Sequence, residues 1–268
     1  MDASDAVAGA RAFRRAVAPV YLRRNQLDVL SELPDKIETE TWVRHSAADE
    51  AAYVDAVCGR NLMAMRQAGF SSPDSAKLER LRELVEEAAQ DGMKVVVFSY
   101  FLGALSLCAR TIGSAVVGTI TGSVVPAERQ RIVDEFTGRT GHTVLLSQVE
   151  AGGVGINMQA ASVVILVEPQ WKPSTEEQAI ARAHRMGQVR TVHVHRLLAK
   201  DSIDERIVEV QQGKRLLFDE FARRSDAKEA DRRAVDGEWH RPAVLDDATM
   251  PIQQRVLMAE QHRLGLER

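Results

Sequence analysis

Three short apolar runs near the middle of the chain predict buried strands. Each is rich in β-branched residues and lacks the alternation of apolar and polar positions, as in parallel strands that are covered on both faces. The runs are residues 94–98 (KVVVF), 143–147 (TVLLS) and 163–167 (VVILV). A fourth run, residues 191–198 (TVHVHRLL), alternates more strongly and predicts a further strand.

Helical patterns lie between these runs. The first spans residues 75–92, ends at Gly92 and carries an apolar stripe on one face. That stripe consists of Leu78, Leu81, Val85 and Ala88. The second begins with Pro126, which suits a first helical turn. It is expected to bury Ile132, Val133 and Phe136. Strands that alternate with helices predict an α/β fold on a parallel sheet with right-handed crossovers.

The two flanks differ from this alternating middle. Residues 1–70 mix arginine-rich and acidic helical stretches with one expected strand at 36–43. Residues 202–224 predict a helix that starts with a capping box between Ser202 and Glu205. After about residue 225 the charges are mixed in sign, and glycine and proline interrupt the pattern. We expect a loosely packed or partner-dependent tail there.

Composition narrows the class of protein. The chain has 268 residues, of which 45% are hydrophobic and 27% are charged, as in ordinary globular proteins. Its two cysteines exclude a disulfide framework and a cysteine metal site. There is no apolar run of the ~20 residues that a membrane helix needs, and acids precede arginines at the start, unlike a secretory signal. We expect a cytoplasmic protein without a membrane partner, or a nuclear one in a eukaryote. The net charge of -3 still leaves room for a local basic surface.

The stretch EEQAIARAHRMGQ (176–188) is the first candidate for chemistry. As a helix that begins with a capping box from Ser174 to Glu177 and ends at Gly187, it would place Gln178, Arg182 and Arg185 on one face. No carboxylate lies three or four positions from either arginine. Guanidinium groups offer planar donors that suit phosphate oxygens. A solvated helix face is the alternative interpretation.

Two neighbouring segments favour the phosphate interpretation. The loop QVEAGGVGIN (148–157) follows one expected strand, and its glycines can present bare N–H groups to phosphates, although a tight turn explains them equally. The turn EPQWKP (168–173) follows the next strand. Ligands of open α/β sheets bind beyond the carboxyl ends of the strands, and all three segments converge on that edge.

The sequence from VVVFSYF (95–101) to ARAHRMGQ (181–188), with its Q-x-x-x-R-x-x-R-x-G-Q pattern, resembles the C-terminal motor lobe of the Swi/Snf-type helicase-like ATPases. These are DNA translocases built from two RecA-like lobes. The resemblance implies a RecA-like parallel sheet with helices on both faces, plus flanking helical segments. It also implies three segments: the end of the first lobe with a linker (1–70), the second lobe (71–200), and a brace helix with a tail (201–268).

The resemblance also implies roles for individual residues. Arg182 and Arg185 match arginine fingers that reach ATP on the other lobe and stabilise charge during phosphoryl transfer. Gln178, Gly153 and Gly155 match positions on the nucleotide side. The positions that match contacts to the DNA backbone are Ser99, Thr121, Gly122, Ser147, Trp171 and Lys172. Arg129 either adds a phosphate contact or is an ordinary surface residue. Such contacts position a motor without reading base sequence.

The sequence also departs from the family pattern. It contains no G-x-x-x-x-G-K-[ST] loop, so ATP and Mg²⁺ would be held mainly by a missing first lobe, in cis or in trans. Gln148 and Glu150 make the glycine loop less suited to phosphate. We expect half of a double-stranded DNA translocase, inactive as this chain alone. The alternative is a stand-alone, non-catalytic DNA- or protein-binding module.

Three further features stay open at this stage. His193 and His195 lie on one strand face, where a metal site is less expected than ordinary strand residues because no third ligand has suitable spacing, so we predict no metal site. The arginines between residues 11 and 24 form either a nucleic-acid contact or a solvated face. For Trp171 we favour a surface-facing role over a place in the core.

Overall fold

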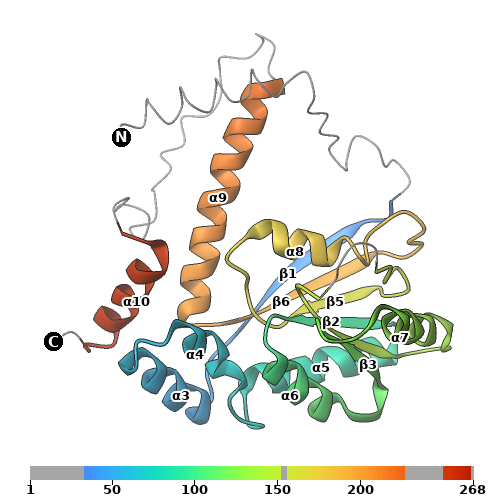
Figure 1. Cartoon of the computed structure of the whole chain (residues 1–268), viewed down its shortest axis with the longest axis horizontal. Helices are drawn as coiled ribbons and strands as arrows, with labels where there is room; N and C mark the ends of the chain where they lie inside the picture. The colour runs from blue at the N-terminus through green and yellow to red at the C-terminus, as the bar shows by residue number, and fades with distance from the viewer. Residues whose placement is uncertain (1–32, 152–155, 227–249, 267–268) are drawn as a thin grey trace. The chain divides into compact units, whose positions relative to one another are not determined.

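The computed structural model describes residues 33–151, 156–226 and 250–266, with side chains of the long helix described as far as Lys214. Within these residues six strands form one parallel sheet in the order β1-β6-β5-β2-β4-β3 (Figure 1). The strands are β1 (Lys36–Val43), β2 (Val95–Ser99), β3 (Val116–Ile120), β4 (Val144–Gln148), β5 (Val163–Leu166) and β6 (Val192–Ala199). The four strands predicted from the middle of the chain are therefore confirmed.

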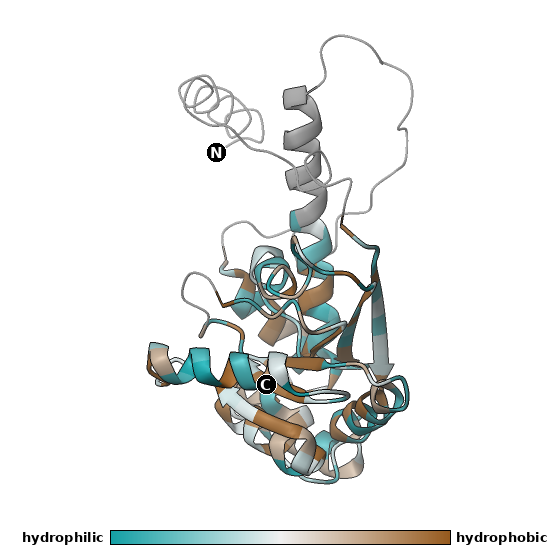
Figure 2. Ribbon diagram, turned by 90° about the vertical axis from the view of Figure 1, so that its right-hand side faces the viewer, coloured by the Kyte–Doolittle hydropathy of each residue, from teal (hydrophilic) through white to brown (hydrophobic). Residues whose placement is uncertain are grey.

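Helices cover both faces of the sheet, as the RecA-like fold requires. Because side chains alternate along a strand, Val95 and Val97 of β2 face one helical layer while Val96 and Phe98 face the other. The first layer is α5 (Ala76–Gln90) and α6 (Leu102–Ile112), and the second is α7 (Pro126–Gly138) and α8 (Pro173–Ile180). Figure 2 shows the brown of apolar residues along the inner strands. The fold class is confirmed.

The two predicted helices of the middle form as their patterns indicate. In α5 the stripe residues Leu78, Leu81, Val85 and Ala88 are all buried. Ser75 caps its first turn by accepting a hydrogen bond from the Lys77 N–H, and Gly92 follows its end with a positive φ of 61°. In α7 Pro126 lies in the first turn, and Ile132, Val133 and Phe136 are buried.

A third apolar cluster lies outside the two layers. It joins α3 (Ala47–Cys58) and α4 (Leu62–Gln67) with α9 (Ile203–Asp226) and α10 (Ile252–Arg263). The prediction of a loosely packed tail is wrong for residues 252–263: Val256 is buried in this cluster, and Glu260 accepts hydrogen bonds from the Tyr53 hydroxyl (2.9 Å) and Arg206 Nε (3.1 Å). Two short 3₁₀ turns, η1 (Ala68–Phe70) and η2 (Gly113–Ala115), connect other elements.

Two details near the ends of elements differ from the sequence interpretation. Strand β1 pairs with β6 along its whole length, so residues 36–43 share a sheet with residues 71–200 although the division by sequence separated them. At the start of α9 the expected capping box does not form. The Ser202 hydroxyl accepts from the Asp204 N–H, and the Glu205 carboxylate accepts from the Asp201 N–H. No helix among the described residues is long and apolar enough to span a membrane.

Candidate functional site

The candidate site lies along the carboxyl edge of the sheet. All six strands are parallel, so their carboxyl ends meet at one edge. Ser99 ends β2, Thr121 and Gly122 follow β3, and Ser147 lies at the end of β4. Trp171 and Lys172 follow β5 and precede α8. The structure thus brings these predicted residues to one edge, while Gly153 and Gly155 lie outside the described residues.

The arginine segment is only partly helical, which corrects the sequence prediction. Helix α8 ends at Ile180, and residues 181–187 continue as successive turns in which the N–H groups of Ala183 and His184 both bond to the Ile180 carbonyl. Its N-cap is Lys172 and no side chain caps it, so the box between Ser174 and Glu177 is absent. Gly187 closes the turns with a positive φ of 93°.

Because the helix stops at Ile180, the two arginines have different surroundings. Arg182 is half-buried: Nη2 donates to the Val149 carbonyl at 3.1 Å, and the guanidinium carbon lies 5.8 Å from the centre of the Phe98 ring. Burial lowers the pKa of Arg182. Arg185 is exposed, and its side chain has no hydrogen bond or ion pair to any residue that the structure describes. Arg185 is therefore available to an external anion.

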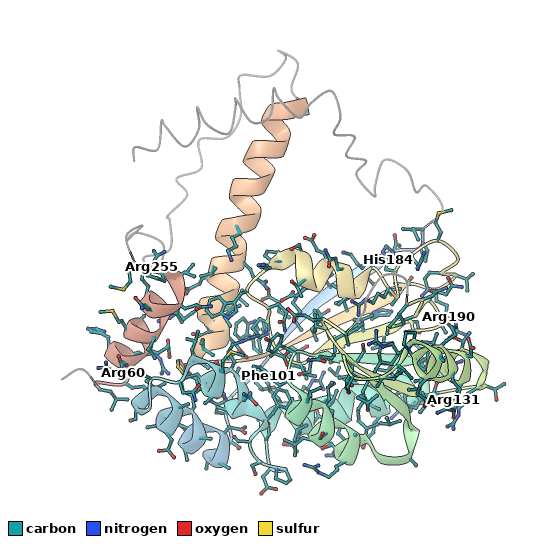
Figure 3. All side chains as sticks on the ribbon, in the orientation of Figure 1. Arg60, Phe101, Arg131, His184, Arg190 and Arg255 are labelled. Carbon is teal, nitrogen blue, oxygen red and sulfur yellow. The ribbon has the colours of Figure 1, made fainter. Side chains whose placement is uncertain are left out.

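Gln188 holds the turn that presents Arg185. Its buried side-chain amide donates to the carbonyls of Gln159 (3.0 Å) and Ala161 (2.8 Å) and accepts from the Val189 N–H (2.9 Å). The sequence interpretation did not assign this residue, although it is the last position of the quoted arginine pattern. Gln178, in contrast, is exposed on α8, and its side chain has no hydrogen bond to any of the described residues. His184 and Arg190 lie in the segment that follows α8 (Figure 3), where a ring nitrogen of His184 is 2.8 Å from the Pro34 carbonyl oxygen and Arg190 is exposed.

The side chains of Gln148 and Arg129 connect the loops that follow β2, β3 and β4. Gln148 donates to the Tyr100 carbonyl (3.2 Å) and accepts from the Gly122 N–H (3.2 Å), which joins the ends of β2, β3 and β4. Arg129 donates to the carbonyls of Val124 (2.6 Å), Ala151 (2.9 Å) and Gly122 (3.0 Å). Arg129 is thus a structural link between two loops.

Two predicted DNA contacts are buried. Ser99 and Ser147 are 0% exposed, and the Ser99 hydroxyl donates to Glu168 Oε2 at 2.9 Å. With no exposed surface, neither hydroxyl is available to a DNA phosphate in this conformation. A strand-end motif does not reveal on which side a small side chain lies. Thr121 is half-buried with its hydroxyl 2.9 Å from that of Ser123, and Gly122 is exposed.

Glu168 is a buried carboxylate that the sequence interpretation did not assign. Burial raises its pKa, while the N–H of Tyr100, the charge of Arg66 and the Ser99 hydroxyl act in the opposite direction. The sequence signal that could have identified Glu168 is its position directly after the apolar run of β5, at the carboxyl end of a strand. Arg66 packs over the rings of Tyr100 (5.5 Å) and Phe101 (5.0 Å) and donates to the Pro169 carbonyl at 3.0 Å.

The turn after β5 presents one exposed cation. Trp171 is half-buried and packs against the cluster that contains α9, so the expectation of a surface-facing side chain holds only in part. Lys172 is exposed beside it. Partial burial and the charge of Lys172 lower the pKa of Lys214 on α9, which places two lysines close together here.

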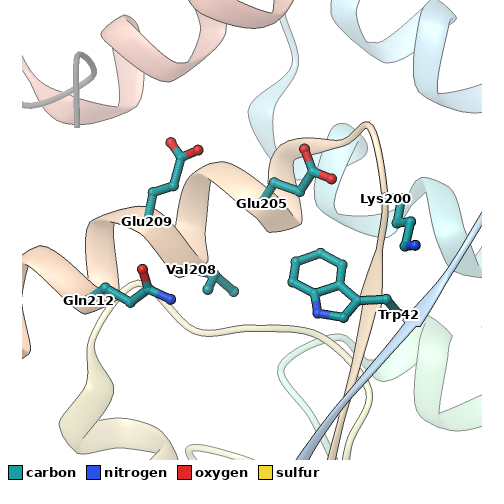
Figure 4. Close-up of a pocket in the computed structure, with 6 residues that line it drawn as sticks. All are labelled: Trp42, Lys200, Glu205, Val208, Glu209 and Gln212. Carbon is teal, nitrogen blue, oxygen red and sulfur yellow. The ribbon is translucent and has the colours of Figure 1, made fainter. Parts of the chain in front are cut away.

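Other candidate features lie apart from this arrangement. A pocket of about 350 Å³ is lined by Trp42, Lys200, Glu205, Val208, Glu209 and Gln212, none of which is a predicted site residue (Figure 4). His193 and His195 are half-buried in β6. Within the described ranges no three His, Cys, Asp or Glu side chains are grouped as metal ligands.

The parallel sheet, its two helical layers and the arginine segment at the carboxyl edge define a RecA-like helicase lobe. Residues 76–187 match the helicase conserved C-terminal domain. The chain is also similar to an uncharacterized ATP-dependent helicase of Mycoplasma pneumoniae, at 32% identity over 75% of this chain and 22% of that protein. The DNA repair protein RAD5B of Arabidopsis thaliana is 38% identical over 54% of this chain and 12% of its own length.

Solved structures agree with these relatives. The Sulfolobus solfataricus SWI2/SNF2 ATPase core domain aligns with a TM-score of 0.58 at 25% identity, covering 78% of this chain and 50% of that one. The same core in complex with dsDNA aligns with a TM-score of 0.55 at 24% identity, over 81% of this chain and 52% of that one. This chain contains a C-terminal helicase lobe of the Swi2/Snf2 type. It spans about a fifth of the length of the Mycoplasma relative (22%).

Proposed function

We propose that this chain supplies the second lobe of a DNA-stimulated ATPase motor, and that Arg185 reaches a nucleotide phosphate presented by a first lobe. The exposure of Arg185 carries the proposal. Gln188 holds the backbone of the turn that contains Arg185, while the Arg185 guanidinium has no partner within the described residues. A fixed arginine at a phosphate stabilises the charge that develops during phosphoryl transfer. Arg182 supports it from a half-buried position.

The available donors fit a phosphate better than a metal ion. This edge offers guanidinium and ammonium groups, and the described residues contain no cluster of metal ligands. Mg²⁺ and most of the nucleotide would therefore be held by a first lobe, in cis or in trans. ATP, when bound there, supplies the phosphoryl group, and this chain contributes positive charge beside its oxygens. Gln178 and the glycines at 153 and 155 would complete the nucleotide side.

Duplex DNA is the second proposed ligand. Thr121, Gly122, Lys172 and the exposed part of Trp171 would contact the phosphate backbone, without preference for base sequence. The S. solfataricus structure with dsDNA supports this ligand class for a similar fold. Residues 1–70 other than β1 would lead from the first lobe. A motor of this kind works where DNA is, in the cytoplasm or nucleoid of a bacterium or in a eukaryotic nucleus.

The test is ATP hydrolysis with and without duplex DNA, for this chain alone and mixed with a matching first lobe. DNA-stimulated turnover is expected only in the mixture. Arg185→Ala should lower turnover by about 10³-fold or more, the scale of arginine fingers in phosphoryl transfer. Glu177→Ala, which changes an exposed residue of α8, is the control. Absence of turnover in every mixture, with DNA or protein binding intact in the Arg185 variant, would instead establish a stand-alone binding module.

A further inference from the structure

Two side chains of α9 bind backbone carbonyls of the segment that follows β5. The buried side chain of Gln211 donates through Nε2 to the Gln170 carbonyl and to Glu176 Oε1 (2.6 Å). Lys214, three residues further along α9, donates to the Trp171 carbonyl at 2.7 Å. Residues three apart in a helix share a face, so both donors point at the same short segment.

Glu176 extends this contact to the rest of the lobe. It is 0% exposed, and its Oε1 also accepts from the Gln170 N–H at 2.8 Å. Its Oε2 accepts from Arg196 Nε of β6 at 2.9 Å, and Arg196 Nη1 lies 2.7 Å from Glu38 of β1. A buried carboxylate needs all of its donors, because each lost partner leaves part of the charge without compensation. Gln211 therefore completes a network that fixes the start of α8.

The side chain of Trp171 adds apolar packing to these polar contacts. It packs against the cluster that contains Ile207 and Val210 of α9. The same stretch of α9 thus holds the turn by two backbone carbonyls and by one indole. Arg66 of α4 also donates to the Pro169 carbonyl, so side chains of two helices hold the backbone of this turn.

We infer that α9 positions the turn 168–172 for DNA, with Gln211 as the positioning residue. Rotation or fraying of α9 near residue 211 would release the Gln170 carbonyl and one donor to Glu176, and would let Lys172 and the start of α8 move. The inference rests on the proposed function, because it assigns a consequence to the DNA contact of this turn. Gln211 is 4% exposed and cannot touch a phosphate itself.

Gln211→Met tests the inference without changing charge or helix propensity appreciably. The matched control is Val208→Ala, also buried on α9 but beside the Trp42 pocket rather than the turn. Two measurements are made on the full chain at a temperature where both variants are folded. One is hydrogen–deuterium exchange of residues 168–180, and the other is anisotropy of a labelled duplex of random sequence.

Faster exchange of 168–180 with duplex affinity about threefold to tenfold weaker is expected for Gln211→Met, the fold-change that corresponds to one hydrogen bond. The control should change neither. Faster exchange with unchanged affinity would support the positioning contact and overturn the DNA role of the turn, which belongs to the proposed function. Unchanged exchange, or an equal effect in Val208→Ala, would overturn the inference itself.

Two substitutions of Lys214 distinguish a positioning role from a direct contact with phosphate. Lys214→Gln keeps a donor for the Trp171 carbonyl and removes the charge, whereas Lys214→Met removes both. Positioning predicts that the glutamine variant protects residues 168–180 from exchange better than the methionine variant does, and binds duplex more tightly. Equal exchange and equal affinity in the two variants would overturn a positioning role for Lys214.

Discussion

At the scale of single residues, Arg182 and Arg185 differ in burial and therefore in what their replacement costs the fold. Arg182→Ala loses the bond to the Val149 carbonyl and the contact with Phe98, so we expect the free energy of unfolding to fall by about 1–2 kcal/mol. Arg185→Ala should change it by less than about 0.5 kcal/mol, because an exposed side chain with no partner among the described residues contributes little. Urea denaturation of both variants measures the difference, and equal losses would contradict it.

Glu38 gives the fold a dependence on acid pH. Burial opposes its ionisation, but Lys36 and Arg196 outweigh that effect and lower its pKa to about 2 from the ordinary 4.5. A carboxylate with a lowered folded-state pKa stabilises the protein fully above the unfolded value and loses that contribution as pH falls. We expect stability to decline between about pH 4.5 and pH 2, and to decline less in Glu38→Gln. Thermal melts across this range measure it. Glu40→Gln, on the same strand, should follow the wild type.

The residues of the candidate site were predictable to different degrees, for physical reasons. The pattern of a motif fixes which loop a residue occupies, so the carboxyl-edge location of Lys172 followed from the sequence, whereas Thr121 and Gly122 were named only from the resemblance because the strand before them was not predicted. It does not fix the direction of a side chain, and Ser99 proved to be buried. Gln148 and Glu168 bond to groups far away in the chain, and no local pattern encodes such partners.

At the scale of elements, glycine in β3 determines how closely α7 packs on the sheet. A Cβ placed on Gly118 would lie 2.9 Å from Cγ2 of Ile132, closer than two carbons pack. Gly118→Ala should therefore destabilise the protein, by about 1–3 kcal/mol for an overpacked core. In Gly103→Ala the new methyl group meets nothing within 4 Å on α6, and better helix propensity should stabilise by up to ~1 kcal/mol. Opposite shifts in melting temperature are the expected result.

The elements that sequence missed share a weak local signal. Strand β3 lies at the edge of the sheet and contains Gly118 and Thr119, so its apolar run is interrupted. Strands β2, β4 and β5 are no longer than β3, but they are buried on both faces, and their uninterrupted apolar runs identified them. Helix α8 was predicted too long because periodicity continues through residues 181–187, where tertiary hydrogen bonds such as that of Met158 to the Arg182 carbonyl form turns instead.

At the scale of the whole molecule, the cations of the carboxyl edge decide how the lobe responds to salt. Among the described residues, Arg129 is used within the fold and Arg182 is half-buried, whereas Lys172 and Arg185 are exposed. DNA affinity that depends on a few phosphate contacts falls with ionic strength in proportion to their number. A lobe of net negative charge should therefore bind duplex weakly and with a shallow salt dependence.

Lys172→Met tests this at the level of counterion release. Log K falls as log salt rises, and removing one phosphate contact should make this fall less steep by about 0.9. Arg139→Met removes one positive charge from the amino edge of the sheet, before β4, and should leave the slope unchanged. The measurement is anisotropy of two unrelated duplexes between about 50 and 200 mM salt, a range over which the loss of phosphate contacts changes affinity measurably. Because no side chain at this edge is proposed to read bases, both duplexes should give the same slope, and a marked preference for one would contradict a backbone-tracking motor.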